Sequence, residues 1–365
     1  MFPANKKIRV LVTDDSMLAR TMISNGLNQS PRIEVVGTAI NAMDARAKID
    51  QLKPDVMTLD VEMPGMSGID FVKQLLPVVP LPVVLVSSLD LRVFDALSAG
   101  AVDFVRKPEP GRNDAFIRAL TGKVIAAAGA RVRSRAGGPS PSGGPAPAAG
   151  GPRLPTTGNK PALPAPPPLG NRPSMDATII GLGASTGGTE ATLEVMKRLP
   201  ADIPAMLIVQ HMPTGFTQMY ADRLNRLCHM EVREAKDGDE LRRGLALLAP
   251  ADLQMRIVRS GTRYTVSCKT GEKVSGHRPS VDALFFSMAE QVKCKMAGII
   301  MTGMGRDGAD GLLKMRQAGA YTIGQDKESS VVYGMPMVAY NIGAVQIQGS
   351  CENIAGILLR QLQRW

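Results

Sequence analysis

The feature that most constrains the fold of this chain is the run GLGASTGGTE, from Gly181 to Glu190. It follows an apolar stretch that begins at Ala177 and precedes a stretch of helical periodicity that begins at Thr189. Glycines on both sides of Ser185 allow a tight turn, so we expect a strand, a turn and a helix in succession. Such a turn exposes the Ser185 hydroxyl at the carboxyl edge of a parallel sheet, beside the positive end of a helix dipole.

Two residues that can assist a serine nucleophile also follow apolar, strand-like runs. His211 follows the run Ala205–Val209, and Asp307 follows the run Ala297–Met301. Because the carboxyl ends of parallel strands meet at one edge of a sheet, we expect a nucleophile, a base and an acid to meet there. A serine hydroxyl is a weak nucleophile unless a base takes its proton and a carboxylate orients that base.

The choice of base is narrow, because the chain has three histidines. His211 is favoured because it ends a strand at the expected ligand edge. His277 lies in the loop GHRPSVD and is a real competitor, so the sequence leaves this choice open. His229 precedes a strand-like run and is interpreted most simply as a structural residue.

The acid has competitors as well, because Asp282 and Asp310 lie in the same part of the chain. Asp307 is favoured because it follows its strand closely, in a run rich in glycine. The run Thr302–Gly305 offers backbone N–H groups, which can stabilise the oxyanion that forms when a serine attacks a carbonyl carbon.

The same glycine-rich turn also resembles the fingerprint of a dinucleotide-binding fold. A dinucleotide site requires an acidic residue at the end of the second strand, where it binds the ribose. This chain has Gln210 and His211 at that place. The sequence therefore favours a hydrolase over a cofactor-binding fold.

The chain divides into two α/β domains joined by a linker. We place the first domain at residues 6–125, the linker at 126–175 and the second domain at 176–362. Residues 136–175 contain twelve prolines and eight glycines, which cannot build a core, so we expect a flexible tether. Five strands are expected in the first domain: Ile8–Val12, Glu34–Ala39, Val56–Leu59, Val83–Val86 and Val102–Val105. Strands that alternate with helices predict parallel sheets covered on both faces.

Three carboxylates end strands of the first domain, namely Asp14, Asp15 and Asp60. Clustered carboxylates repel one another unless a divalent cation neutralises them, and hard oxygen ligands suit Mg²⁺. Ser87 ends the fourth strand and Lys107 follows the fifth. A hydroxyl and an ammonium group facing such a site are suited to bind the oxygens of a phosphoryl group on Asp60.

These residues resemble the receiver domains of response regulators, which have a flavodoxin-like (βα)5 fold. The resemblance rests on TDDS at 13–16, LDVEMPGMSG at 59–68, VSS at 86–88 and DFVRKP at 103–108. It implies that Asp60 accepts a phosphoryl group from a histidine kinase. It implies Mg²⁺ ligation by Asp15, Asp60 and the backbone carbonyl of Glu62, with Asp14 acting through water. Ser87 would be the switch hydroxyl and Lys107 the phosphate contact.

The second domain resembles the catalytic domain of the CheB family of chemotaxis protein-glutamate methylesterases, a doubly wound parallel-sheet fold. The motifs are GLGASTGG at 181–188, VQHMP at 209–213, GHRPSVDALF at 276–285, MTGMGRDGADG at 301–311 and IGQDKESSVVYGMP at 323–336. The resemblance implies a triad of Ser185, His211 and Asp307, with Thr186 and the Met304 backbone positioning the substrate carbonyl or its oxyanion. It implies that the receiver covers the active site until Asp60 is phosphorylated.

The net charge of +10 raises the possibility of nucleic-acid binding, but its location argues against it. No acidic residue lies between Asp114 and Asp176, and removing the basic residues of that stretch leaves a net charge of about +2. We therefore interpret the basicity as a property of the linker rather than of a binding face. The basic residues are Arg118, Lys123, Arg131, Arg133, Arg135, Arg153, Lys160 and Arg172.

The sequence predicts a cytoplasmic, monomeric signalling hydrolase. No apolar run reaches the roughly 20 residues that span a bilayer, and the N-terminus lacks a signal-peptide pattern. As the resemblance implies, the expected reactions are demethylation of glutamate methyl esters on chemoreceptors, releasing methanol, and deamidation of selected glutamines, without a cofactor for the hydrolysis. Two rivals remain: a phosphorylation-controlled interaction protein without turnover, and a receiver-regulated hydrolase acting on another ester.

Overall fold

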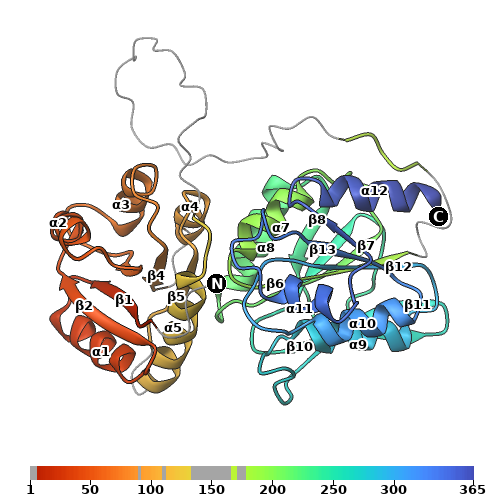
Figure 1. Ribbon diagram of the computed structural model, residues 1–365. Helices are drawn as coiled ribbons and strands as arrows, with labels where there is room; N and C mark the ends of the chain where they lie inside the picture. The colour runs from red at the N-terminus through yellow and green to blue at the C-terminus, as the bar shows by residue number, and fades with distance from the viewer. Residues whose placement is uncertain (1–5, 89–91, 109–111, 133–165, 171–177) are drawn as a thin grey trace, which may run out of the picture.

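The computed structural model describes residues 6–88, 92–108, 112–132, 166–170 and 178–365. It contains two α/β domains, which lie side by side (Figure 1). The predicted linker, residues 126–175, lies mostly outside the described residues, but its predicted start was too early, because the last helix of the first domain continues to Ala128. Its segment 166–170 is described and contacts the second domain: the N–H of Leu169 donates to Asp202, and Arg243 donates to the carbonyl of Gly170.

The first domain is a five-stranded parallel sheet with the strand order β2-β1-β3-β4-β5. Its helices cover both faces, as the alternation of strands and helices predicts. The strand order reverses between β1 and β3, which opens a crevice at their carboxyl ends. The strands are β1 (Ile8–Thr13), β2 (Ile33–Ala39), β3 (Val56–Asp60), β4 (Val83–Ser87) and β5 (Asp103–Arg106). The helices are α1 (Met17–Asn28), α2 (Ala42–Leu52), α3 (Gly68–Leu75), α4 (Val93–Ser98) and α5 (Asn113–Ala128).

The second domain is built on a seven-stranded parallel sheet with the order β14-β13-β12-β6-β7-β9-β8. The chain starts in the middle at β6, runs to one edge through β7, and then returns to fill the other side through β12. The reversal between β6 and β12 creates a crevice at the carboxyl edge. The strands of this sheet are β6 (Ile179–Ala184), β7 (Ala205–Gln210), β8 (Glu231–Glu234), β9 (Leu245–Leu248), β12 (Met296–Ile300), β13 (Tyr321–Gln325) and β14 (Ile347–Gly349).

Helices cover both faces of this sheet as well. Side chains of α7, α8 and α12 join one core cluster, and those of α9, α10 and α11 join another. An antiparallel hairpin, β10 (Gln254–Ser260) with β11 (Arg263–Lys269), packs on α9 and departs from the predicted regular alternation. The helices are α7 (Gly188–Met196), α8 (Phe216–Leu227), α9 (Val281–Gln291), α10 (Ala309–Gln317), α11 (Met335–Asn341) and α12 (Ile354–Arg364).

One apolar core continues from the first domain into the second. Phe94 of α4 stacks on Tyr220 of α8 with ring centroids 5.6 Å apart, and Phe104 of β5 packs on Phe216 at 4.6 Å. The guanidinium of Arg223 lies 5.5 Å from the centroid of the Phe94 ring. Aromatic pairs of this kind stabilise an interface beyond the apolar area that they bury.

Polar contacts surround this aromatic interface. Arg223 of α8 pairs with Glu190 at 2.8 Å and donates to the Ser98 hydroxyl at 2.7 Å. Ser98, at the end of α4, in turn donates to Glu190 at 3.1 Å. Arg106, at the end of β5, donates to the backbone carbonyl of Thr214 at 3.3 Å. The receiver-like domain is therefore held against the second domain by specific contacts as well as by the covalent linker.

Candidate active site

Ser185 lies directly after β6, on the tight turn that the sequence predicts. Its carbonyl accepts hydrogen bonds from the N–H of Gly188 at 2.7 Å and from the side chain of Gln210 at 2.8 Å. Gly187 has a φ of 75°, and a Cβ atom there would lie 2.5 Å from Val331. The turn therefore requires glycine, and it directs Ser185 to the crevice between β6 and β12.

His211 and Asp307 form the ion pair expected of a base and the acid that orients it. His211 Nε2 lies 2.8 Å from Asp307 Oδ2, and both side chains are almost entirely buried. With Asp307 ionised, Nε2 carries the proton and Nδ1 keeps its lone pair. The Nδ1 atom is buried and has no hydrogen-bond partner among the described residues. It is therefore the nitrogen that can accept a proton from a serine.

Asp307 is held by a set of donors at the start of α9. It accepts hydrogen bonds from the Ser280 hydroxyl at 2.7 Å and from the backbone N–H groups of Val281 and Asp282, both at 2.9 Å. Burial would raise the pKa of Asp307, but these donors and His211 outweigh it and hold the pKa below its usual value. The carboxylate is consequently fixed in its charged form.

The two competing carboxylates have other partners. Asp282 is buried and accepts hydrogen bonds from the Ser275 hydroxyl at 2.6 Å and from the N–H of Gly311 at 2.7 Å. Asp310 pairs with Arg306 on the exposed side of α10. Of these three carboxylates, only Asp307 forms an ion pair with a histidine in the described structure.

His277 lies beside His211 rather than in its place. The two rings stack with centroids 3.9 Å apart and an interplanar angle of 6°. His277 Nδ1 lies 2.9 Å from the Ser275 carbonyl and 3.8 Å from Asp307. Burial and the neighbouring His211 lower the pKa of His277 to about 4, so the ring is neutral at neutral pH. The direct pair with Asp307 supports His211 as the base and His277 as a supporting ring.

Thr186 and Met304, which the family resemblance implies in positioning the substrate carbonyl, line the same cleft as Ser185. The N–H groups of Thr302 and Gly303 already donate to other groups in the protein. Met304 and Gly305 line the cleft. Within the run Thr302–Gly305, their backbone N–H groups are therefore the ones suited to bind an oxyanion. The Thr186 hydroxyl donates at 2.6 Å to Asp103, a buried residue of β5 in the first domain.

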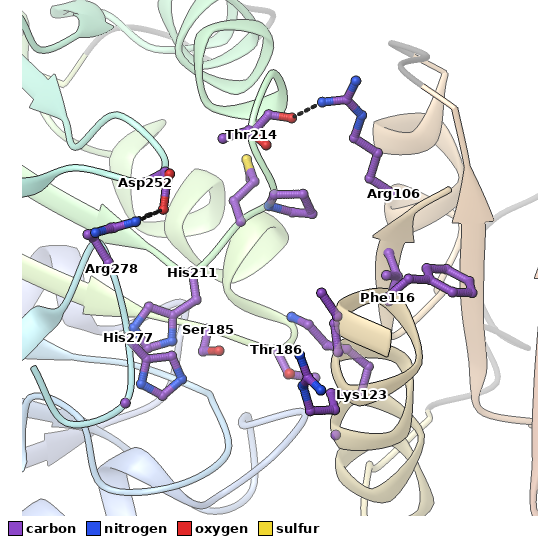
Figure 2. Close-up of a pocket in the computed structure, with 18 of the residues that line it drawn as sticks. Arg106, Phe116, Lys123, Ser185, Thr186, His211, Thr214, Asp252, His277 and Arg278 are labelled. Atoms are coloured by element: carbon purple, nitrogen blue, oxygen red, sulfur yellow. Dashed lines mark hydrogen bonds and ion pairs between the residues drawn. The ribbon is translucent and has the colours of Figure 1, made fainter. Parts of the chain in front are cut away.

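The candidate site opens into a cleft of about 850 Å³ between the two domains. Figure 2 shows Ser185, His211 and His277 on one side of it, with Lys123 and Phe116 of the receiver-like domain opposite. Lys123 also pairs with Asp103 at 2.7 Å. Because both domains line the cleft, access to Ser185 depends on how the first domain is placed.

The acidic pocket of the first domain has formed as the sequence predicts. The ligand atoms of Asp14, Asp15 and Asp60 lie within 4.8 Å of one another. Lys107 Nζ lies 2.8 Å from Asp60 Oδ2, and the N–H of Glu62 donates to Asp60 at 3.1 Å. The pocket lies at the crevice between β1 and β3, where a doubly wound sheet binds its ligands.

Two observations indicate that this pocket is suited to a divalent cation and a phosphoryl group. Asp14 Oδ2 and Ser87 Oγ are both buried without a hydrogen-bond partner among the described residues. Burial, then the charge of Asp60, raises the pKa of Asp14 to about 6. Carboxylate oxygens that are buried without a hydrogen-bond donor are suited to bind Mg²⁺. The Ser87 hydroxyl can bind an oxygen of a phosphoryl group on Asp60.

Comparisons with known proteins support both the hydrolase domain and the receiver domain. Residues 180–358 match the CheB methylesterase family, and residues 10–118 match the response regulator receiver domain. The protein-glutamate methylesterase/protein-glutamine glutaminase 2 of Syntrophomonas wolfei is 47% identical over 98% of this chain and 99% of its own length. The chain belongs to the CheB methylesterase family.

Two further relatives extend the comparison with the CheB family. The protein-glutamate methylesterase/protein-glutamine glutaminase of Sulfurimonas denitrificans is 46% identical over 95% of this chain and 96% of its own length. The crystal structure of the CheB methylesterase catalytic domain of Thermotoga maritima is 33% identical, with a TM-score of 0.49, over 50% of this chain and 97% of that one. No helix in the described part of the chain is long and apolar enough to cross a membrane.

The sequence did not predict the roles of three residues of this CheB-family site. Ser280 fixes Asp307, Gln210 fixes the Ser185 carbonyl, and Asp103 holds Thr186 from the other domain. Ser280 carries a local signal, because a serine before an apolar helical run is a typical N-cap. Asp103 carries no such signal, since its partner lies 83 positions away.

Proposed function

We propose that this chain hydrolyses glutamate methyl esters on chemoreceptors and that its receiver domain controls the reaction. The observation that carries the proposal is the buried His211–Asp307 pair beside Ser185, in a chain of the CheB methylesterase family. The paired histidine and carboxylate supply the base that a serine nucleophile requires. The receiver places this chemistry under phosphorylation control.

The geometry supports a double-displacement mechanism. The Ser185 hydroxyl attacks the γ-carbonyl carbon, and its proton passes to His211 Nδ1. The backbone N–H of Met304 stabilises the oxyanion, together with Thr186. The C–O bond to methoxide breaks, and His211 returns the proton so that methanol leaves. Water then attacks the acyl-serine, His211 again takes the proton and returns it to Ser185, and glutamate is released. Asp307 remains ionised throughout and stabilises the imidazolium.

The same residues can act on glutamine. The amide presents the same carbonyl carbon, and protonation by His211 allows ammonia to leave in place of methanol. The relatives from Syntrophomonas wolfei and Sulfurimonas denitrificans both carry the glutaminase designation. We therefore propose that selected receptor glutamines are deamidated at this site as well.

Asp60 is the proposed phosphoacceptor, with a histidine kinase of the chemotaxis system as phosphodonor. Mg²⁺ would be held by Asp15, Asp60 and the Glu62 carbonyl, with Asp14 acting through water. When bound, the ion neutralises the charge of the carboxylates and of the phosphoryl oxygens. The ester hydrolysis needs no cofactor in this proposal.

Phosphorylation at Asp60 is proposed to loosen the domain interface. Lys107 pairs with Asp60 and directly follows β5, the strand that carries Phe104 and Asp103 to the interface. A phosphoryl group would attract the Lys107 ammonium and the Ser87 hydroxyl, and would shift this end of β5. The contact between Asp103 and Thr186 then weakens, and the cleft opens to substrate.

We propose that the protein works as a monomer in the cytoplasm. Its own second domain covers the face of the receiver formed by α4, β5 and α5. The proposed reactions require the protein to meet the kinase and the receptor segments that carry glutamate. We propose no nucleic-acid partner and no insertion into a membrane.

The experiment that tests the chemistry follows both products. Receptor membranes carrying labelled glutamate methyl esters are incubated with the full chain, Mg²⁺ and a small phosphodonor. Volatile methanol is measured, and the receptor segment is examined by mass spectrometry for glutamate. Receptor carrying glutamine at the same positions is assayed for ammonia. Absence of both products from a folded, phosphorylated protein would eliminate the proposed activity.

A further inference from the structure

Nearly all of the charged residues that line the cleft beside Ser185 are cations. Asp252 is the one carboxylate among the described residues that line it. Its basic lining residues come from both domains and are Arg106, Lys107, Arg112, Arg118, Lys123, Lys273 and Arg278. An excess of one sign of charge in a cleft concentrates ligands of the opposite sign.

Three of these cations already have carboxylate partners. Lys107 pairs with Asp60, Lys123 with Asp103, and Arg278 with Asp252 at 2.6 Å. These pairs contribute little net charge to the cleft. They therefore do not explain what the positive lining would bind.

Arg118 of α5 and Lys273 of the loop before α9 differ from these paired cations. Both are exposed, and the side chain of neither forms an ion pair or a hydrogen bond within the described part of the chain. They belong to opposite domains and line the same cleft as Ser185. The charges of Arg118 and Lys123 were counted with the linker on sequence grounds, and that interpretation was wrong for these two residues, because α5 carries both of them to the cleft.

The reacting group cannot be the ligand of these cations. A glutamate methyl ester and a glutamine are both uncharged, so a lysine or an arginine gains little by binding them. Carboxylates in the same substrate segment are different, because an arginine fork or an ammonium binds them by charge-assisted hydrogen bonds. Free cations beside Ser185 are thus suited to groups that flank the reacting side chain.

We propose that Arg118 and Lys273 bind unmodified glutamate carboxylates that flank the reacting ester, and that phosphorylation widens the cleft without removing α5 from its wall, so that the receiver forms part of the substrate site. The inference rests on the proposed function and adds a preference for acidic substrate segments. It has a consequence for successive reactions on one receptor. Each hydrolysis creates a carboxylate, and that carboxylate favours binding of the next ester beside it.

The test compares two receptors that carry one glutamate methyl ester at the same position. In one receptor the neighbouring modification sites are glutamate, and in the other they are alanine, which this enzyme cannot convert. The full chain is used with Mg²⁺ and saturating phosphodonor, and kcat/KM for methanol release is measured on each. The ratio of the two values cancels any change in the fraction of active enzyme.

The wild type should prefer the glutamate-flanked receptor by about fivefold or more, as expected for two partly exposed charge pairs. Arg118→Glu and Lys273→Glu should each lower this ratio, and the double variant should abolish or invert it. The matched control carries Lys73→Glu on α3 and Lys314→Glu on α10, exposed lysines that do not line the cleft. It has the same change of net charge and should keep the wild-type ratio.

The outcomes separate this inference from the proposed function. Methanol release at equal rates from both receptors would leave the function intact and overturn the inference. An unchanged ratio in Arg118→Glu would overturn the receiver's part in substrate binding. Equal losses in the cleft variant and in the surface control would show an effect of net charge alone, and would also overturn it. Absence of methanol from both receptors would instead refute the proposed function.

Discussion

Asp103→Asn should raise the activity of the unphosphorylated protein. One carboxylate oxygen of Asp103 accepts hydrogen bonds from the Thr186 hydroxyl at 2.6 Å and from Lys123 at 2.7 Å, and the other accepts the N–H of Phe104 at 2.9 Å. An asparagine has one oxygen, so it cannot serve both sides. If that oxygen keeps the hydrogen bond from the N–H of Phe104, the amide nitrogen faces the Thr186 hydroxyl and the Lys123 ammonium, which are both donors.

The size of the effect follows from which contact crosses between domains. The Lys123–Asp103 pair lies within the receiver and persists when the domains separate, whereas the Thr186–Asp103 bond exists only in the closed arrangement. A hydrogen bond to a charged group contributes about 1.5–3 kcal/mol. Losing it shifts the opening equilibrium by roughly tenfold to 150-fold, since each 1.4 kcal/mol is a factor of ten. Basal activity should rise accordingly until the open form predominates.

The assay is the initial rate of methanol release from methylated receptor membranes, with and without a phosphodonor. Asp103→Asn should raise the rate without phosphodonor and leave the stimulated rate nearly unchanged. Asp70→Asn, the same change on the exposed start of α3, should behave as the wild type. An unchanged basal rate in a folded Asp103→Asn protein would refute the idea that this contact helps to keep the site closed.

Three further predictions concern the base, the phosphoacceptor and the pH dependence of stability. His211→Ala should reduce methanol release on the order of 10⁴-fold, and His277→Ala clearly less, because His211 lies within hydrogen-bond distance of Asp307 at 2.8 Å whereas His277 lies 3.8 Å away; equal losses in folded proteins would contradict this assignment. Asp60→Asn should abolish both Mg²⁺-dependent phosphoryl uptake and its stimulation of methanol release, measured with a labelled phosphodonor; stimulation that survives would place control elsewhere. The pKa of His277 is about 4 in the fold and 6.5 in the unfolded chain, so acidification from pH 6.5 towards 4 protonates the unfolded state first and lowers stability. His277→Gln should therefore lose less thermal stability than the wild type between pH 7 and pH 5; an identical loss would contradict the lowered pKa.

The sequence predicted the elements of this fold well because their signals are local. Each predicted strand of the receiver lies within one or two residues of the observed one, as Ile8–Val12 against β1 shows. Buried parallel strands are short apolar runs, and the helices between them begin at capping residues such as Ser16 and Ser67. Ser185 and His211 directly follow β6 and β7, and Asp307 lies in the loop after β12, the neighbour of β6 in the same sheet, so the parallel-strand pattern predicts that they share one edge.

Contacts between distant parts of the chain could not be predicted in this way. The β10–β11 hairpin interrupts the alternation of strands and helices without changing the parallel sheet. The choice between His211 and His277 depended on a distance to Asp307 that no local pattern encodes. The bond from Thr186 to Asp103 depends on how two domains pack. Arg118 was misplaced for the same reason, because composition does not show which face of α5 meets the second domain.

Ser185 is proposed to be a nucleophile whose use depends on the receiver. The most direct test of this proposal is methanol release from one preparation of labelled receptor membranes by the phosphorylated wild type, the unphosphorylated wild type and phosphorylated Ser185→Ala. We expect fast release, slow release and none above background, respectively, with Ser185→Ala still folded and still taking up phosphate at Asp60. Release by Ser185→Ala above one tenth of the wild-type rate would contradict the proposal.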